Sequence, residues 1–429
     1  MMQTRVAAWI SACVLASFSL LLAFSVSAQT AADLQSKIGQ RAEDIKALEK
    51  EIAGYQKQLD EIGTQVSSLS ATVKSLQLTQ KKLEADIKVT ENKIVEKNIQ
   101  IQLLSSQISD KQETISDDRR IIARSYVSVN ELGSRSLPEL LLSEKSLSAA
   151  WGSLDSIAAV QKGLVDRIAS LENAKANLEV NKKATEKAKA ELLSLNSQLK
   201  DQRSVVLGTA NQQKQLLDDT KQSEAKYQAM LAQKKNLKEL FEREVLDLES
   251  QLKLTIDPAS IPHTGSGVLS WPLDAITVTQ YFGNTPFATA NSQIYNGKGH
   301  TGVDFRASIG TPIKASLSGT VVGVANTDII PSCYSYGKWI MIKHGNGLST
   351  LYAHLSLQSV SVGQQVVTGQ IIGYSGNTGY TTGPHLHYGV YATEGIRITK
   401  LAPGMSKNCS GATIPLADFK AYLNPLSYL

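Results

Sequence analysis

Four histidines and one aspartate in the C-terminal part of this 429-residue chain have types and spacings that suggest chemistry. They lie in three short segments: GHTGVDF with His300 and Asp304, LYAHLS with His354, and GPHLHYG with His385 and His387. If the last segment is a strand, side chains two residues apart point to the same face. The pair alone would equally suit two polar residues on an exposed strand face, so the other segments have to decide.

Together these segments supply the ligands of a catalytic zinc site. Such a site takes three protein ligands of N and O type and keeps a further position for water. His300, Asp304 and one of the last two histidines provide that set. Zinc lowers the pKa of bound water toward about 7 and polarises a carbonyl under attack. The remaining histidines can then move the proton or stabilise the oxyanion.

In this order, and with GTPIKASLSGTV between them, the three segments resemble the lysostaphin-type (LytM-like) zinc metallopeptidases that cut peptidoglycan cross-links. The resemblance spans roughly residues 270–400. It implies an antiparallel sheet with a narrow substrate groove roofed by loops. It implies His300, Asp304 and His387 as the Zn²⁺ ligands, and His385 and His354 as the two catalytic histidines. The substrate implied is the stem peptides of peptidoglycan.

Three classes of function stay open. The first is an exported zinc endopeptidase for cell-wall remodelling or daughter-cell separation. The second is a catalytically silent activator of other hydrolases or a wall-binding protein, as in a branch of the family that has lost zinc ligands. All five motif positions here hold the competent residue, which favours the enzyme. The third is a coiled-coil rod that its C-terminal domain only anchors.

Other residues near the motifs receive structural interpretations. His344 in KHGNG is expected at the end of a strand, and His263 in a solvated linker. Tyr352, Tyr380 and Tyr388 border the motifs and could either line the groove or pack in the core. The segment Thr381 to Gly383 is expected to shape the turn before the histidine strand.

The elements around the motifs are short. Runs such as GTVVGVAN, KWIMIKHG and HLHYGVYA alternate with glycine turns and predict a mostly antiparallel β domain over residues 268–429. A linker rich in proline, glycine and serine precedes it at residues 256–267. No phosphate-binding glycine loop occurs. The fold class predicted is α + β: a helical coiled coil followed by this domain.

The coiled coil is predicted over residues 29–255. A seven-residue ladder of mainly apolar residues runs from Ile38 through Ile45, Ile52 and Leu59 to Ile122. Such a repeat is typical of a coiled coil, and one helix of about 90 residues would be roughly 135 Å long. Glycine and proline interrupt the pattern between residues 130 and 138, and a second long helical pattern follows.

Two long helices joined by a short tip, near residues 131–157, predict an antiparallel hairpin, with a parallel dimer as the alternative. LPELLLSEKSLSAAWGSLDSI is similar to the hairpin tip of exported proteins that carry a coil before a LytM-like domain. This second resemblance implies docking on a membrane division complex of the FtsEX type. It also implies helical segments that hold the catalytic groove closed until that contact is made.

The N-terminus predicts export. Arg5 precedes an apolar run that ends in Val26-Ser27-Ala28, so residues 1–28 read as a signal peptide cleaved before Gln29. An uncleaved anchor is the alternative, because the uncharged stretch from Val6 to Ala32 could span a bilayer. The protein is therefore expected in the periplasm or cell wall, or on the outer face of the cytoplasmic membrane.

Charge and cysteine content complete the sequence-based picture. Losing Arg5 with the signal lowers the net charge from +5 to +4. Without a basic cluster carrying interleaved aromatics, this does not indicate nucleic-acid binding. Two cysteines, Cys333 and Cys409, remain in the exported chain, and we expect them to form a disulfide.

Overall fold

The computed structural model describes residues 31–63, 68–133, 146–251, 261, 263–285, 289 and 299–429. The predicted signal peptide, half of the predicted linker and residues 134–145 of the predicted tip lie outside these ranges. The chain divides into two compact units. Unit 1 contains residues up to Glu43 and Val95–Leu192, and unit 2 contains Asp44–Ile94 and Leu193–Leu429.

Unit 1 consists of parts of three helices: α2 (Ala31–Gly63), α3 (Leu69–Gly133) and α5 (Leu147–Thr220). Three polar contacts join α3 to α5. Lys97 pairs with Glu191 at 2.6 Å, Asn181 donates to Gln107 at 3.4 Å, and Arg167 pairs with Asp118 at 3.5 Å. Positions rise along α3 as they fall along α5, so the two helices are antiparallel, as the predicted hairpin requires.

Two details of the predicted coil are wrong. The ladder expected to form one helix is divided between α2, which ends at Gly63, and α3, which begins at Leu69. A heptad repeat indicates which face of a helix is apolar. The same repeat can run on across a break between two helices, so it does not mark where one helix ends. At the tip, residues from Leu147 onward begin the long helix α5 and do not form a separate short helix.

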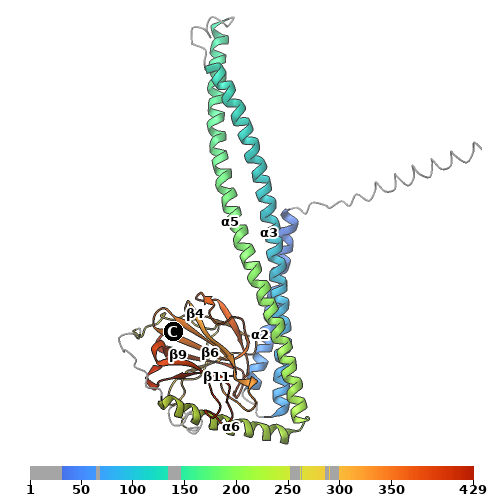
Figure 1. Cartoon of the computed structure of the whole chain (residues 1–429). Coiled ribbons are helices and arrows are strands. Elements are labelled where there is room, and N and C mark those ends of the chain that lie inside the picture. Colours follow the sequence, from blue (N-terminus) through green and yellow to red (C-terminus); the bar gives the residue numbers. More distant parts are fainter. Residues whose placement is uncertain are drawn as a thin grey trace, which may run out of the picture. The chain divides into compact units, whose positions relative to one another are not determined.

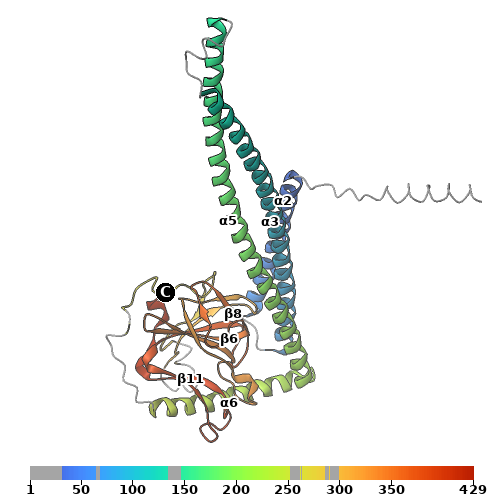
Figure 2. The same ribbon diagram turned by 45° about the horizontal axis from the view of Figure 1, so that its top comes forward.

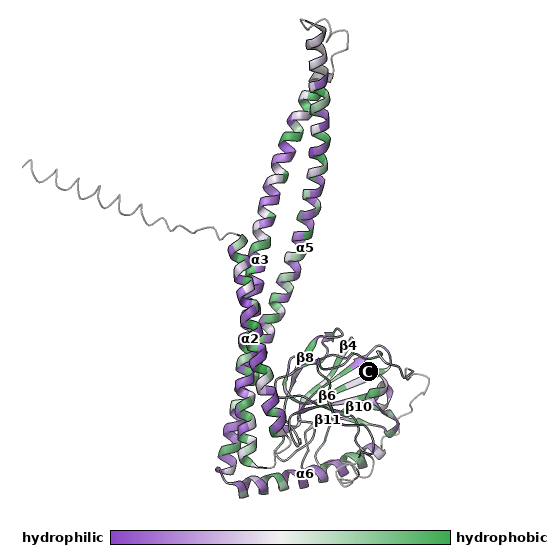
Figure 3. Ribbon diagram, turned by 180° about the vertical axis from the view of Figure 1, so that it is seen from behind, coloured by the Kyte–Doolittle hydropathy of each residue, from purple (hydrophilic) through white to green (hydrophobic). Residues whose placement is uncertain are grey.

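Hydropathy follows the helical repeat along α3 and α5, where apolar and polar residues alternate in bands (Figure 3). In unit 2 the apolar side chains of the helices also contact the β domain: Leu76 and Leu83 of α3 and Val205 of α5 pack with Ile309 and Tyr374. Among the described residues, no helix combines the length and apolar composition needed to cross a bilayer.

The second helical pattern also breaks where none was predicted. Lys221 and Gln222 adopt left-handed backbone angles, with φ of 46° and 57°, and separate α5 from α6 (Glu224–Gln251). Helix α6 runs along the β domain beside β11, as both views show (Figures 1 and 2). Its Phe241 is 1 % exposed and packs with both cysteines and with Leu401. The segment expected to end the coil is therefore packed on the domain that carries the motifs.

The β domain is antiparallel throughout, as predicted. Its large sheet has the strand order β1-β2-β9-β6-β5-β4-β7, with β12 beside β9 and with β8 beside β3 and β6. The strands of this sheet are β1 (Val278–Gln280), β2 (Val303–Arg306), β3 (Pro312–Lys314), β4 (Gly319–Asn326), β5 (Lys338–His344), β6 (Leu348–Gln358), β7 (Gln365–Val366), β8 (Ile371–Ser375), β9 (His385–Ala392) and β12 (Tyr422–Leu423). A second sheet pairs β10 (Ile396–Lys400) with β11 (Thr413–Ala417).

Both faces of the central strands are buried. One core contains Phe305, Ile340, Tyr352 and Tyr388, and the other contains Trp339, Met341, Leu351 and Tyr391. Tyr352 and Tyr388 therefore belong to the core and do not line a groove. This burial makes the strand register rigid, because a one-residue slip would turn every side chain to the wrong face.

Three predictions for particular residues are confirmed. His344 ends β5 and is buried, with its ring nitrogens bonded to the Ser318 carbonyl and the Thr350 hydroxyl. Cys333 and Cys409 form the expected disulfide, which joins the loop after β4 to the loop between β10 and β11. His263 is exposed, as expected for a linker residue.

Candidate active site

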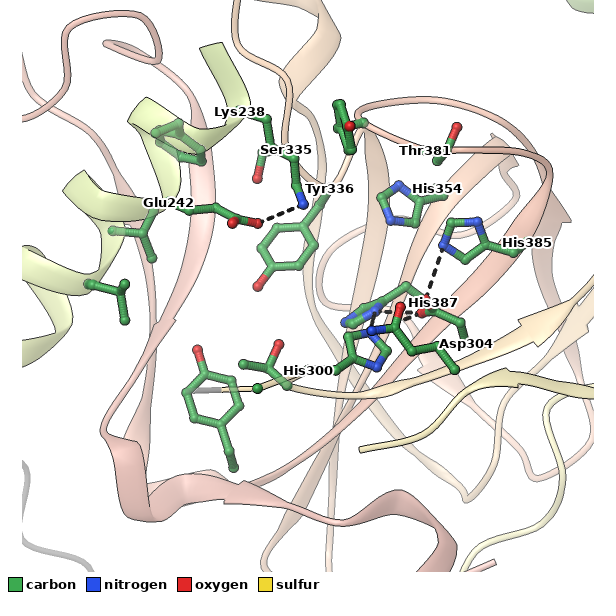
Figure 4. A pocket seen from close by; sticks show the side chains of 18 of the residues that line it. Lys238, Glu242, His300, Asp304, Ser335, Tyr336, His354, Thr381, His385 and His387 are labelled. Carbon is green, nitrogen blue, oxygen red and sulfur yellow. Dashed lines mark hydrogen bonds and ion pairs between the residues drawn. The ribbon is translucent and has the colours of Figure 1, made fainter. Parts of the chain in front are cut away.

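Strand register brings the five motif residues together on one face of the sheet (Figure 4). On β2 and β9, Asp304 lies opposite His387 and Arg306 lies opposite His385. On the other side of β9, Ala353 of β6 lies opposite His387, which places His354 next to the site. His300 enters from the loop before β2, where its backbone pairs with Gly283. The strand period therefore aims both rings of the H-x-H segment into one space, as predicted.

Three of these side chains form a small triangle of ligand atoms. His387 Nδ1 lies 2.9 Å from Asp304 Oδ1 and 3.1 Å from His300 Nε2, and His300 Nε2 lies 3.2 Å from Asp304 Oδ1. Ligands about 2.0–2.2 Å from a tetrahedral zinc ion lie about 3.3 Å from one another. Two imidazole nitrogens and one carboxylate oxygen at these separations fit a zinc ion. This is the only such group found among the described residues.

The surroundings orient these ligands. His300 Nδ1 lies 3.0 Å from the Tyr281 carbonyl, so this nitrogen carries the proton and Nε2 presents its lone pair to the triangle. Glycine at position 302 makes room for the ring of His387. A Cβ there would lie 2.5 Å from the Tyr388 carbonyl and 2.8 Å from His387 Cε1. Gly302, the second glycine of GHTGVDF, is therefore needed for the close packing of His387.

The other two histidines face the triangle from β6 and β9, and carbonyls of the loop between β8 and β9 hold both rings. His354 Nδ1 lies 2.9 Å from the Thr378 carbonyl, and His385 Nδ1 lies 2.8 Å from the Gly383 carbonyl. In each ring the proton on Nδ1 is donated to the backbone, which leaves Nε2 free to accept. The two rings lie 4.7 Å apart between centroids, and His385 Nε2 is 3.7 Å from Asp304 Oδ2.

Electrostatics keep this site in the protonation states that metal binding requires. Burial favours the neutral form of Asp304, but His385, His300 and His387 outweigh it and hold the pKa of this carboxyl well below its usual range. Burial, together with the neighbouring imidazoles, holds the pKa of His354 well below 6.5. Burial also lowers the pKa of His387. An ionised carboxylate and neutral imidazoles are the forms that bind zinc.

The site lies in a cavity of about 180 Å³. The predicted turn residues Thr381 and Thr382 line it, together with Tyr380, Ser335 and Tyr336. A second cavity, of about 300 Å³, continues past His385 between Arg306 and the helices α2 and α3. There Arg306 pairs with Asp60 at 3.7 Å, and Ser308 donates to Gln56 at 2.8 Å.

Helix α6 supplies the lining residues that sequence reasoning missed. Lys238 and Glu242 point into the cavity from the side of Tyr336 and pair with each other at 3.0 Å (Figure 4). Lys238 also lies 4.6 Å from the centroid of the Tyr380 ring. These charges looked like part of a solvated coil face, and nothing in the local pattern marks them as different. The weaker heptad register of this stretch is the one available signal.

Comparisons with known proteins agree with this geometry. Residues 298–398 match peptidase family M23. The chain is 46% identical over 89 residues to DD-carboxypeptidase/endopeptidase Mpg of Neisseria meningitidis serogroup B. The matched segment covers 21% of this chain and 19% of that protein. It is 42% identical over 119 residues to peptidoglycan DD-endopeptidase ShyA of Vibrio cholerae, covering 28% and 24%.

A third relative is lysostaphin of Staphylococcus simulans, which is 46% identical over 94 residues, covering 22% of this chain and 18% of that protein. The matched segments span about a fifth to a quarter of the length of these three relatives. The family match concerns the domain that carries the motifs.

Proposed function

Because residues 298–398 form a domain of the zinc-dependent peptidase family M23, we propose that this protein is a zinc endopeptidase that cleaves peptide cross-links of peptidoglycan. The observation that carries the proposal is the triangle of His300, Asp304 and His387 ligand atoms, with two further imidazoles facing it. The names of its relatives, which include a peptidoglycan DD-endopeptidase, support the substrate class.

His300, Asp304 and His387 would hold the metal. Bound zinc would polarise the scissile carbonyl and lower the pKa of a water molecule toward about 7. His385 and His354, with Nδ1–H fixed on carbonyls, present Nε2 as the acceptor for the proton that the attacking water loses. Whichever of these two Nε2 atoms accepted the proton then returns it to the leaving amine. A protonated imidazole beside the developing oxyanion also stabilises its charge.

The alternative is a catalytically silent activator of other hydrolases. Complete occupancy of the five motif positions, with the ligand atoms already about 3 Å apart, argues for the active enzyme. Digestion of purified peptidoglycan by residues 29–429 tests this. We expect mass analysis to find cut cross-links between stem peptides and intact glycan strands. No peptide products from zinc-bound protein whose helix α6 has been released, as by Phe241→Ala, would favour the activator.

The helices are proposed to regulate access to the site. Helix α6 lines the cavity and is hydrogen-bonded to the β domain between Leu237 and Glu249. Glu249 accepts from Tyr422 Oη at 2.6 Å and from the Ala417 amide at 3.1 Å. Glu244 accepts from the Lys407 amide at 3.0 Å, and Asn408 donates to the Leu237 carbonyl at 3.0 Å. A helix held in this way would exclude a peptidoglycan stem peptide from the side of Tyr336.

Release of α6 would then require a partner, for which we propose a membrane division complex of the FtsEX type. In unit 1, several large apolar side chains near the hairpin end of α3 and α5 are exposed to solvent. They are Tyr126 at 63%, Val127 at 54%, Trp151 at 68% and Val165 at 65%. We propose that these side chains contact the partner, since protein interaction sites often expose apolar surface.

This partner proposal is tested with a substitution and a matched control. Trp151→Glu should abolish binding to the extracytoplasmic part of such a complex, because it places a charge in the proposed contact. Val180→Glu changes an equally exposed residue of α5, at 64%, farther from the hairpin end. Equal binding by both variants would contradict the proposal.

The same function requires export, and the proposed route is the signal peptide of residues 1–28. A periplasmic or cell-wall location follows from the substrate, since peptidoglycan lies outside the cytoplasmic membrane. Mass analysis of the N-terminus of the secreted protein tests this. Gln29 at the N-terminus supports cleavage, whereas an intact N-terminus in the membrane fraction would support the anchor.

A further inference from the structure

The peptide group between Thr378 and Gly379 bridges one catalytic-site histidine and a carboxylate. Its carbonyl lies 2.9 Å from His354 Nδ1. Its N–H points the other way and donates to both carboxylate oxygens of Asp328, each at 3.0 Å. Asp328 belongs to the short 3-10 helix η2 (Thr327–Ile329) that follows β4. The order of groups is therefore carboxylate, peptide and imidazole.

Neighbouring bonds hold this peptide in place. The Thr378 hydroxyl donates to the Leu355 carbonyl at 2.8 Å and accepts from the Lys338 amide at 3.0 Å. Gly379 has φ of 73°, and a Cβ there would lie 2.1 Å from the Ser335 carbonyl. Such close backbone contact leaves the peptide no room to rotate away from Asp328.

His354 itself needs such support. Its backbone φ is 61°, in the left-handed region that non-glycine residues rarely adopt. Its amide donates to the Tyr336 carbonyl at 2.9 Å, which fixes the backbone. Among the described residues, the hydrogen bond that holds the ring is the one from Nδ1 to the Thr378 carbonyl. The tautomer of a histidine is set by the hydrogen bond that its other nitrogen makes. The strength of the bond to Thr378 therefore decides whether Nε2 is available.

We propose that Asp328 is a positioning residue that acts on His354 through the Thr378–Gly379 peptide. A negative charge at the N–H end polarises the peptide and makes its carbonyl oxygen a stronger acceptor, since hydrogen bonds in a chain polarise one another. The carboxylate thus holds His354 in the tautomer that carries its proton on Nδ1. The positive charges of two lysines, Lys234 of α6 and Lys338 of β5, favour the ionised form of Asp328. Because the Asp328 side chain is solvent-exposed, the effect is moderate.

Two substitutions separate the charge of Asp328 from its hydrogen bond. Asp328→Asn keeps an acceptor for Gly379 but removes the charge, and Asp328→Ala removes both. Asp274→Asn is the matched control, because this exposed aspartate of the same domain pairs with Lys314 away from the site. The measurements are histidine-ring ¹⁵N NMR of residues 29–429, which resolves six imidazoles, and steady-state cleavage of a soluble cross-linked muropeptide.

We expect the fraction of His354 with its proton on Nδ1 to fall in Asp328→Ala and to fall less in Asp328→Asn. The value of kcat should fall roughly tenfold in Asp328→Ala, the lower end of what outer residues contribute, with KM changed less than about twofold. An unchanged His354 spectrum in both variants would overturn the inference. So would equal tautomer loss in Asp274→Asn. The kinetic part rests on the proposed peptidase activity, whereas the NMR part stands even if no cleavage occurs.

Discussion

Phe241→Ala in the mature chain is the most informative single perturbation of the proposed regulation. Phe241 is the most deeply buried side chain of α6, 1 % exposed, and packs on the disulfide and on Leu401. Phe241 lines the same cavity as the five motif residues but is not one of them, so Phe241→Ala keeps all five side chains. If α6 blocks the groove, weakening its attachment should increase the cleavage rate.

The size of this increase follows from the burial. Truncating a fully buried phenylalanine to alanine costs about 3–5 kcal/mol. Each 1.4 kcal/mol changes an equilibrium constant about tenfold, so the constant for docking of α6 should fall at least about 100-fold. The cleavage rate should rise with the fraction of released helix, until all molecules are open. We expect a gain of at least about tenfold.

The assay compares peptidoglycan cleavage by wild type, Phe241→Ala and Arg243→Ala. Arg243 lies two residues along the same helix and is exposed, which makes its replacement the control for helix propensity. Hydrogen exchange of the α6 amides reports release independently. Rapid exchange in Phe241→Ala without any gain in rate would refute the reasoning, because an open groove would then be no more active than a closed one.

Three further predictions concern the site, the core and the disulfide. His387→Ala should lose bound zinc, whereas His385→Ala should keep it and cleave about 10²–10⁴-fold more slowly; zinc retained by both would contradict the ligand assignment. Burial lowers the pKa of His344 in the folded state. As the pH drops below about 6.5, the unfolded state therefore takes up a proton on this histidine before the folded state does, and the free energy of unfolding should fall. His344→Gln should flatten that slope in urea titrations, and an unchanged slope would exclude His344 as its source. Serine at Cys333 and Cys409 should cost about 2–5 kcal/mol of unfolding free energy, and two free thiols in the secreted wild type would exclude the bond.

The site was predictable because its chemistry is local in sequence. An H-x-H segment on a strand must place both rings on one face, and His385 and His387 do so whatever surrounds them. The assignment of His387 as the proposed metal ligand and of His385 as the proposed acid–base residue rests on the family resemblance. The structure adds which nitrogen of each ring faces inward. That depends on carbonyls such as those of Thr378 and Gly383, whose positions no side-chain pattern encodes.

The helices were harder to predict for a physical reason. A heptad repeat indicates an apolar stripe but not the surface that covers it. In α6 that stripe contributes Phe241, which packs on the β domain. The turn that redirects the chain uses Lys221 and Gln222 at positive φ, where glycine or asparagine would normally mark such a conformation. Asp328 was missed likewise, because it reaches His354 only through a peptide bond.

The central claim is best tested by following the release of new amino groups from purified peptidoglycan. Residues 29–429 would be assayed as wild type and as Phe241→Ala, with zinc and with a chelator, beside the same two chains carrying His385→Ala. Zinc-dependent release that the chelator and His385→Ala both abolish, and that Phe241→Ala accelerates, is the result predicted. No release from the zinc-bound Phe241→Ala chain, with its helix shown to be free, would contradict the assignment as a peptidoglycan endopeptidase.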